Sequence, residues 1–134
     1  MIVVDTNILV YFWIPGDFTE LAEKLLKKDS NWIAPTLWRS EFRNVLACHL
    51  RRKDFPLAQA QEIMVNAENH MQGAEHQVPS IQVLDLVNRS KCTAYDCEFI
   101  ALAEQMSLPL ITADVGLINS FPKIAKNIKS YVEE

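Results

Sequence analysis

The stretch Ile2-Val3-Val4-Asp5-Thr6-Asn7 decides the fold, because it places a carboxylate directly after a short, fully apolar run. Three consecutive β-branched residues predict a strand that is buried on both faces. Leu108-Pro109-Leu110-Ile111-Thr112 repeats this pattern and leads to Asp114. The carboxyl ends of parallel strands lie at one edge of a sheet, so we expect Asp5 and Asp114 on the same side.

The rest of the chain alternates between short apolar runs and amphipathic segments. Further strands are expected at residues 32–34, 76–78 and 128–131, and helices at 7–13, 17–28, 35–53, 56–72, 80–88 and 93–106. Sequences that resemble capping boxes open two of the helices, at Asp17 and Thr93. This alternation predicts an α/β fold, a three-layer α/β/α sandwich with a central, mostly parallel sheet of four or five strands. No linker or repeat divides residues 1–134, so we expect a single domain.

The composition excludes several classes of protein. With only three glycines, the chain has no glycine-rich phosphate loop. No apolar run approaches the roughly 20 residues that cross a bilayer, and no basic region precedes Asp5, so we expect no membrane span and no signal peptide. The three cysteines lack disulfide or zinc spacing. We therefore expect reduced cysteines and a cytoplasmic protein.

Two further acids lie on the apolar faces of predicted helices. Glu41 shares a helix face with Trp38 and Val45, and Asp96 shares one with Phe99. Buried carboxylates are costly unless a cation or hydrogen bonds compensate them. A hard divalent metal, and hence phosphate chemistry, is therefore predicted at a set of four acids: Asp5, Glu41, Asp96 and Asp114.

Each acid also has an ordinary interpretation. Asp5 and Asp114 could each cap the helix or turn that follows, and Asp96 could complete a capping box with Thr93. Glu41 could pair with a nearby arginine at the rim of the core. These interpretations explain the acids one by one, but they do not explain why all four should face one cleft.

Four motifs occur in a fixed order: Val4-Asp5-Thr6-Asn7, Glu41 in the long third helix, Ala94-Tyr95-Asp96, and Leu110-Ile111-Thr112-Ala113-Asp114. Over Met1 to Tyr131 they resemble a PIN domain, and more narrowly the VapC-type toxin ribonucleases. Val115-Gly116 departs from the polar or basic residues that often follow the last acid.

The resemblance implies that the four acids bind Mg²⁺ or Mn²⁺ and hydrolyse RNA phosphodiesters, leaving 5′-phosphate and 3′-hydroxyl ends. We expect Asp5 and Asp96 to be the main metal ligands, Asp114 to complete the shell, and Glu41 to bind a second ion or position the attacking water. Polar neighbours that match the family are expected to orient the carboxylates: Thr6, Asn7 and Thr112. The resemblance also implies a toxin with a cognate antitoxin protein, and a homodimer.

Other readings remain open. The net charge is −4, yet five basic residues lie between Arg39 and Lys53, either on a solvated helix face or along a substrate-binding edge that includes Arg39 and Arg43. A housekeeping RNA-processing PIN nuclease would share the same acids, and a non-catalytic PIN-like domain could bind RNA or protein. A haloacid-dehalogenase-type phosphatase is disfavoured, because Asn7 stands where that chemistry needs a second aspartate. The apolar run Tyr11–Ile14 is expected to pack on the sheet, or else to form a partner surface.

Overall fold

Five parallel strands form the centre of the computed structural model, which describes residues 1–134. The strand order is β3-β2-β1-β4-β5. The strands are β1 (Ile2–Val4), β2 (Trp32–Pro35), β3 (Glu75–His76), β4 (Leu110–Thr112) and β5 (Ala125–Asn127). All residues of β1, β2 and β4 are buried, as expected for short strands covered by helices on both faces.

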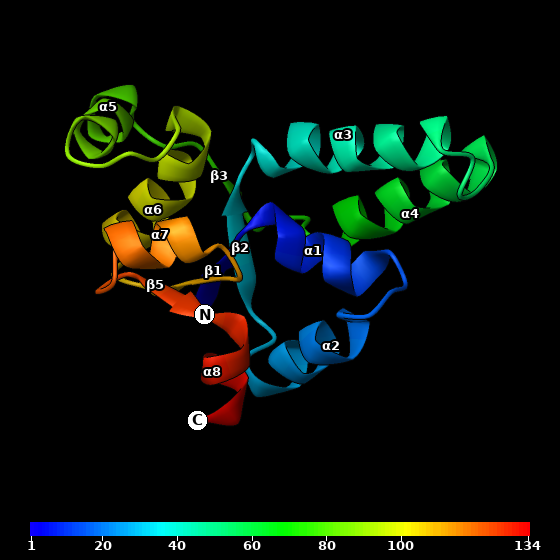
Figure 1. The fold of residues 1–134 in the computed structure, drawn as a ribbon, viewed down its shortest axis with the longest axis horizontal. Coiled ribbons are helices and arrows are strands. Elements are labelled where there is room, and N and C mark those ends of the chain that lie inside the picture. Colours follow the sequence, from blue (N-terminus) through cyan, green and yellow to red (C-terminus); the bar gives the residue numbers. More distant parts are fainter.

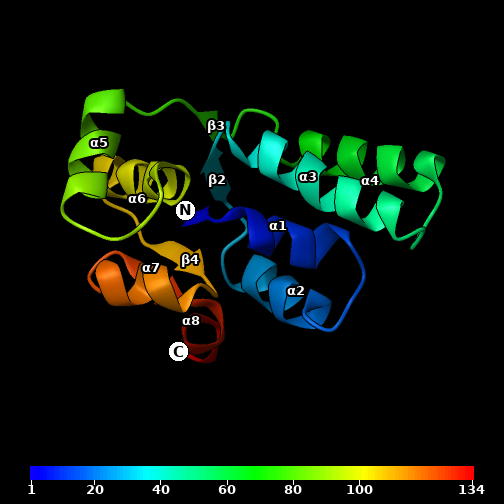
Figure 2. The same ribbon diagram turned by 45° about the horizontal axis from the view of Figure 1, so that its top comes forward.

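Helices flank the sheet on both sides, which confirms the predicted α/β/α architecture (Figure 1). They are α1 (Thr6–Trp13), α2 (Thr19–Lys28), α3 (Trp38–Arg51), α4 (Leu57–His70), α5 (Ser80–Asn88), α6 (Ala94–Met106), α7 (Val115–Ser120) and α8 (Ile128–Glu133). Helices α1, α2 and α8 lie on one side of the sheet, and α5 and α6 lie on the other. The α3–α4 pair packs on α1 and extends beyond the sheet (Figure 2). None of these helices has the length and apolar character needed to cross a bilayer.

Strand order reverses at β1, and this reversal positions the site. From β1 the chain moves outward to β2 and β3, then returns to place β4 on the other side of β1. Val4 pairs with Ile111, so Asp5 and Thr112 follow side by side at the same edge. Ligands of open α/β sheets bind at such a reversal, beyond the carboxyl ends of the strands.

Two local predictions were wrong. Residues 128–131 form the start of α8 and not an edge strand, because the Asn127 side chain accepts hydrogen bonds from the backbone N–H groups of Lys129 and Ser130 and so caps a helix. The edge strand β5 ends directly before it. Asp17 does not cap α2, which begins at Thr19 without a side-chain cap.

The apolar run Tyr11–Ile14 packs within the molecule, as its ordinary interpretation predicted. The indole N–H of Trp13 donates to Nδ1 of His70 on α4, with the two nitrogens 3.0 Å apart. Phe12 packs edge-on against Trp32, and Tyr11 packs against Phe18. These contacts fix α1, the helix that Asp5 caps, against α4 and β2.

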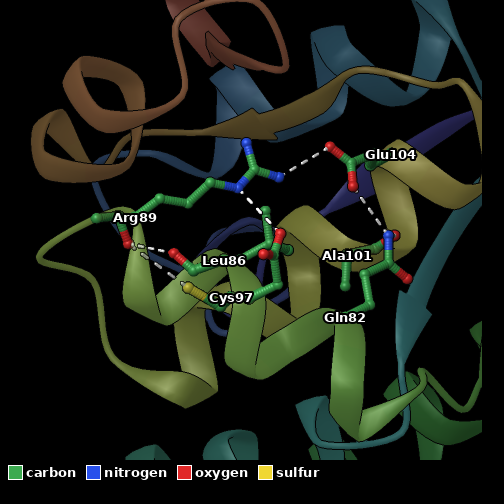
Figure 3. A network of polar contacts seen from close by, with 8 residues as sticks. Gln82, Leu86, Arg89, Cys97, Ala101 and Glu104 are labelled. Atoms are coloured by element: carbon green, nitrogen blue, oxygen red, sulfur yellow. Dashed lines mark hydrogen bonds and ion pairs between the residues drawn. The ribbon is translucent and has the colours of Figure 1, made fainter.

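Polar contacts fix α6, the helix that carries Asp96, against α5 (Figure 3). Gln82 donates to the Glu104 carboxylate and to the Ala101 carbonyl, over 3.1 and 3.3 Å. Arg89 pairs with Glu104 at 3.6 Å. The Ser90 hydroxyl, which follows α5 and donates to the Leu86 carbonyl over 2.8 Å, lies 4.0 Å from Cys97 Sγ on α6. These bonds complement the apolar face that α6 buries against β1, β2 and β4.

Candidate active site

The four predicted acids line one cleft of about 430 Å³ beside the carboxyl ends of β1 and β4. Helices α3 and α6, which both contribute side chains to the cleft, lie on opposite sides of β1 and β2 (Figure 1). Apolar side chains line part of it: Leu37, Val45, Phe99 and Leu117. Strand ends and helix faces distant in sequence therefore bring the predicted carboxylates together.

Asp5 is the most buried of the four acids, with 7% of its surface exposed. One carboxylate oxygen caps α1 by accepting a hydrogen bond from the Ile8 backbone N–H at 3.2 Å, and the other accepts one from the Thr112 hydroxyl. Burial raises the pKa of Asp5 to about 6, against the opposing effect of these hydrogen bonds. The negative charges of Asp114 and Glu41 contribute a smaller part of this increase.

Asp114 caps the next element and touches the same threonine. Its Oδ1 accepts a hydrogen bond from the Leu117 backbone N–H at 3.1 Å, and its own N–H donates to Thr112 Oγ1 at 2.9 Å. Thr112 thus connects the Asp5 carboxylate to the backbone of Asp114. Gly116 allows this arrangement, since a Cβ there would lie only 3.1 Å from Asp114 Oδ1.

Glu41 enters the cleft from α3 and has no basic partner. Its Oε1 accepts a hydrogen bond from the Thr6 hydroxyl at 2.7 Å. The nearby Arg39 instead binds Glu75 at 2.6 and 2.7 Å and Glu68 at 2.6 Å, so the alternative of an arginine pair for Glu41 is not observed. Burial raises the pKa of Glu41, and the charge of Asp96 adds to the effect.

Asp96 lies in the first turn of α6. Its backbone N–H donates to Thr93 Oγ1 at 3.1 Å, but the reciprocal bond from the Thr93 backbone to the Asp96 carboxylate is not made. Only half of the predicted capping box forms, which leaves the carboxylate free for the cleft. Burial and then the charge of Asp114 raise the pKa of Asp96.

Of the other predicted site residues, some line the cleft and others do not. Thr6 and Asn7 line the cleft, whereas neither Arg39 nor Arg43 does. Arg43 is exposed on α3, one residue before the cleft-lining Asn44.

Four cleft or near-cleft residues were missed: Ser40, Asn44, Tyr95 and Glu98. Asn44 stands three residues after Glu41, so the helical repeat could have placed it on the same face. Glu98 is partly buried on α6, and burial together with the charge of Glu41 raises its pKa.

The donor set suits a hard cation. Four carboxylates line the cleft, and the lining contains no lysine, arginine, histidine or cysteine. Oxygen donors of this kind are the ligands of Mg²⁺ and Mn²⁺. As placed, no three of these side chains are gathered closely enough to hold an ion together. The match therefore lies in the chemistry of the donors. Burial, and then the charges of neighbouring carboxylates, raise the pKa values of Asp5, Glu41 and Asp96, and no cationic side chain lines the cleft.

A family model for the PIN domain matches residues 2–126. The chain belongs to the PIN domain family. No curated protein matches its sequence.

Solved structures share this PIN fold. PAE2754 from Pyrobaculum aerophilum has a TM-score of 0.78 and 20% identity, covering 98% of this chain and 92% of its own. FitAcB from Neisseria gonorrhoeae has a TM-score of 0.76 and 17% identity, with 96% and 99% covered. A toxin–antitoxin complex from Klebsiella pneumoniae has a TM-score of 0.64 and 16% identity, with 96% and 98% covered.

Proposed function

We propose that this PIN domain is an endoribonuclease that requires Mg²⁺ or Mn²⁺. PIN domains are in general nucleases, which supports hydrolysis of a nucleic acid. The observation that carries the proposal is the cleft itself, which four carboxylates line and no cationic side chain offsets. Asp5, Asp96 and Asp114 would hold the cation, with Glu41 beside them. When bound, such a cation polarises a phosphate oxygen and makes water easier to deprotonate.

The side chains have distinct roles in this reaction. Thr112 orients Asp5 and Asp114, and Thr6 holds one oxygen of Glu41. The second oxygen of Glu41 has no hydrogen-bond partner, and the raised pKa of this group suits it to take a proton from the attacking water. Water adds to phosphorus as the bond to the 3′-oxygen breaks. The 3′-oxygen takes a proton from solvent, which gives 5′-phosphate and 3′-hydroxyl ends.

Assays of single-stranded RNA cleavage test this proposal, first with protein treated with a chelator and then after Mg²⁺ or Mn²⁺ is added back. Wild type should cleave only with Mg²⁺ or Mn²⁺. Asp96→Asn should lower the cleavage rate at least about 100-fold, because mutating even the residues that hydrogen-bond to metal ligands lowers activity by about 10- to 100-fold. Glu23→Gln is the matched control, since Glu23 is an exposed acid on α2 outside the cleft. Full metal-dependent cleavage by Asp5→Asn and Asp96→Asn would falsify the assignment. Equal cleavage of DNA would remove the restriction to RNA.

We further propose that the nuclease is the toxin of a toxin–antitoxin pair, acts in the cytoplasm and forms a homodimer. A similar fold occurs in the Klebsiella pneumoniae toxin–antitoxin complex, and three unpaired cysteines suit a reducing compartment. Induced wild type should arrest growth, Asp5→Ala should not, and a protein encoded beside the gene should copurify and relieve the arrest. Harmless expression of an active nuclease would favour the housekeeping alternative.

A further inference from the structure

Tyr95 is an aromatic side chain at the cleft with 62% of its surface exposed. The chain has three tyrosines, and the other two have ring partners: Tyr11 packs on Phe18, and Lys28 lies over Tyr131. The Tyr95 ring has no aromatic or cationic partner, and its hydroxyl makes no hydrogen bond within the protein. Exposing such a ring beside Asp96 contributes nothing to the core.

The cleft has no basic side chain with which to hold a phosphate backbone. Nucleic-acid sites without sequence preference usually combine a positive groove with aromatic stacking, and here only the second component is available within the cleft. The neutral polar side chains that line the cleft include Asn44 and Ser40, both exposed on α3. A carboxamide such as that of Asn44 offers both donors and an acceptor, which suits the edge of a base.

We propose that Tyr95 stacks on one unpaired base of the substrate beside the scissile phosphate, while Asn44, which lines the same cleft from α3, contacts the edge of that base. Helices α6 and α3, which carry these two side chains, lie on opposite sides of β1 and β2 (Figure 1). A base must leave its duplex to stack on an amino-acid ring, so the site selects single-stranded RNA. This assignment rests on the proposed function and names the group by which the same cleft selects its substrate.

Binding without cleavage tests the assignment independently of catalysis. The probe is a set of short single-stranded RNAs with 2-aminopurine at successive positions, added with Mg²⁺ to protein carrying Glu41→Gln. We expect fluorescence quenching at one position, retained with Tyr95→Phe and lost with Tyr95→Leu, which keeps apolar volume without a ring face. Phe18→Leu is the control, because Phe18 is 54% exposed but lies outside the cleft.

Kinetics supply the second measurement. Stacking of one base is worth about 1–3 kcal/mol, so Tyr95→Leu should raise KM by about 5- to 150-fold with kcat little changed. Quenching that is absent at every position, or equal in Tyr95→Leu, would overturn the assignment, as would equal binding of duplex RNA. Loss of binding to a protein partner with RNA binding intact would place Tyr95 on a protein interface instead. Position-specific quenching without any cleavage by wild type would retain the stacking site and reject only the proposed nuclease function.

Discussion

Helix α3 carries two charged side chains that meet opposite environments, Arg39 and Glu41. Arg39 binds the carboxylates of Glu75 and Glu68, and its guanidinium lowers the pKa of Glu75. Two residues later, Glu41 faces a cleft that no cationic side chain lines, and burial raises its pKa. The protein therefore pairs acids with an arginine outside the cleft but leaves the cleft acids unpaired. Under the proposed function, a divalent cation from solution would offset the charge of those acids.

The two regions should depend on pH in opposite directions. Folding raises the pKa of Asp5, so protonation of this carboxyl group stabilises the fold at low pH. This stabilisation falls as pH rises from about 4 to about 6. The contribution of Glu75, whose pKa is lowered, is present above its ordinary pKa and is lost as pH falls through the lowered value.

Among the side chains that support the cleft acids, the largest effect is expected where one threonine serves two of them. Thr112→Val removes the hydroxyl that donates to Asp5 and accepts from the Asp114 backbone, so activity and Mn²⁺ affinity should fall by up to about 100-fold. Thr6→Val removes a hydrogen bond to Glu41 alone, so activity should fall by about 10-fold. Mn²⁺ titrations of cleavage measure both, with Thr112→Ser as the rescue. Equal losses at the two threonines would contradict this ranking.

Asp5→Asn should stabilise the metal-free protein at pH 8 while it abolishes cleavage. The difference between a pKa of about 6 and the ordinary 3.8 is equivalent to about 3 kcal/mol, and loss of the Thr112 hydrogen bond offsets about 1 kcal/mol. Urea unfolding in chelator at pH 8 and pH 4 measures the gain, which should vanish at pH 4. A gain that is the same at both pH values would show that the charge of Asp5 is not its source.

Arg39→Met should destabilise the protein by about 1–2 kcal/mol at neutral pH, because Glu75 and Glu68 lose their partner in a partly buried setting. Arg43→Met is the matched control on the same helix and should change stability by less than about 0.5 kcal/mol. Thermal unfolding measures both variants. If Arg39→Met instead weakens RNA binding without loss of stability, Arg39 contacts the substrate as the sequence first suggested.

Gly116→Ala should have the smallest effect. Alanine favours the helix over glycine by about 0.5–1 kcal/mol, but its Cβ would push the Asp114 carboxylate by a few tenths of an ångström. Because Asp114 is exposed and can shift, we expect slightly higher stability and a loss of activity of only a few-fold. Unfolding and cleavage assays on the same variant measure the gain in stability and the loss of activity. Unchanged activity would mean that the position of Asp114 is not critical.

Local signals made much of the site predictable. The apolar strands before Asp5 and Asp114 fixed the edge of the sheet, and helical spacing placed Glu41 and Asp96 toward it. The error at residues 128–131 arose because four residues show too little periodicity to separate strand from helix, and the cap at Asn127 was overlooked.

Contacts between residues far apart in the sequence could not be predicted from local patterns. The pairing of Arg39 with Glu75 spans 36 residues and depends on how α3 meets β3, which no local pattern encodes. The exposed ring of Tyr95 was likewise quoted only as part of a motif. Its exposure depends on what α6 leaves uncovered, and that follows from the tertiary packing.

Three of the cleft acids stand where helices begin: Asp5 before α1, Asp114 before α7, and Asp96 in the first turn of α6. The aligned peptide dipoles give each helix start up to about half a positive elementary charge. Together they could supply up to about 1.5 positive charges, against four carboxylates, before any ion arrives. The backbone thus moderates the field at the cleft and softens the repulsion that an approaching phosphodiester would otherwise meet.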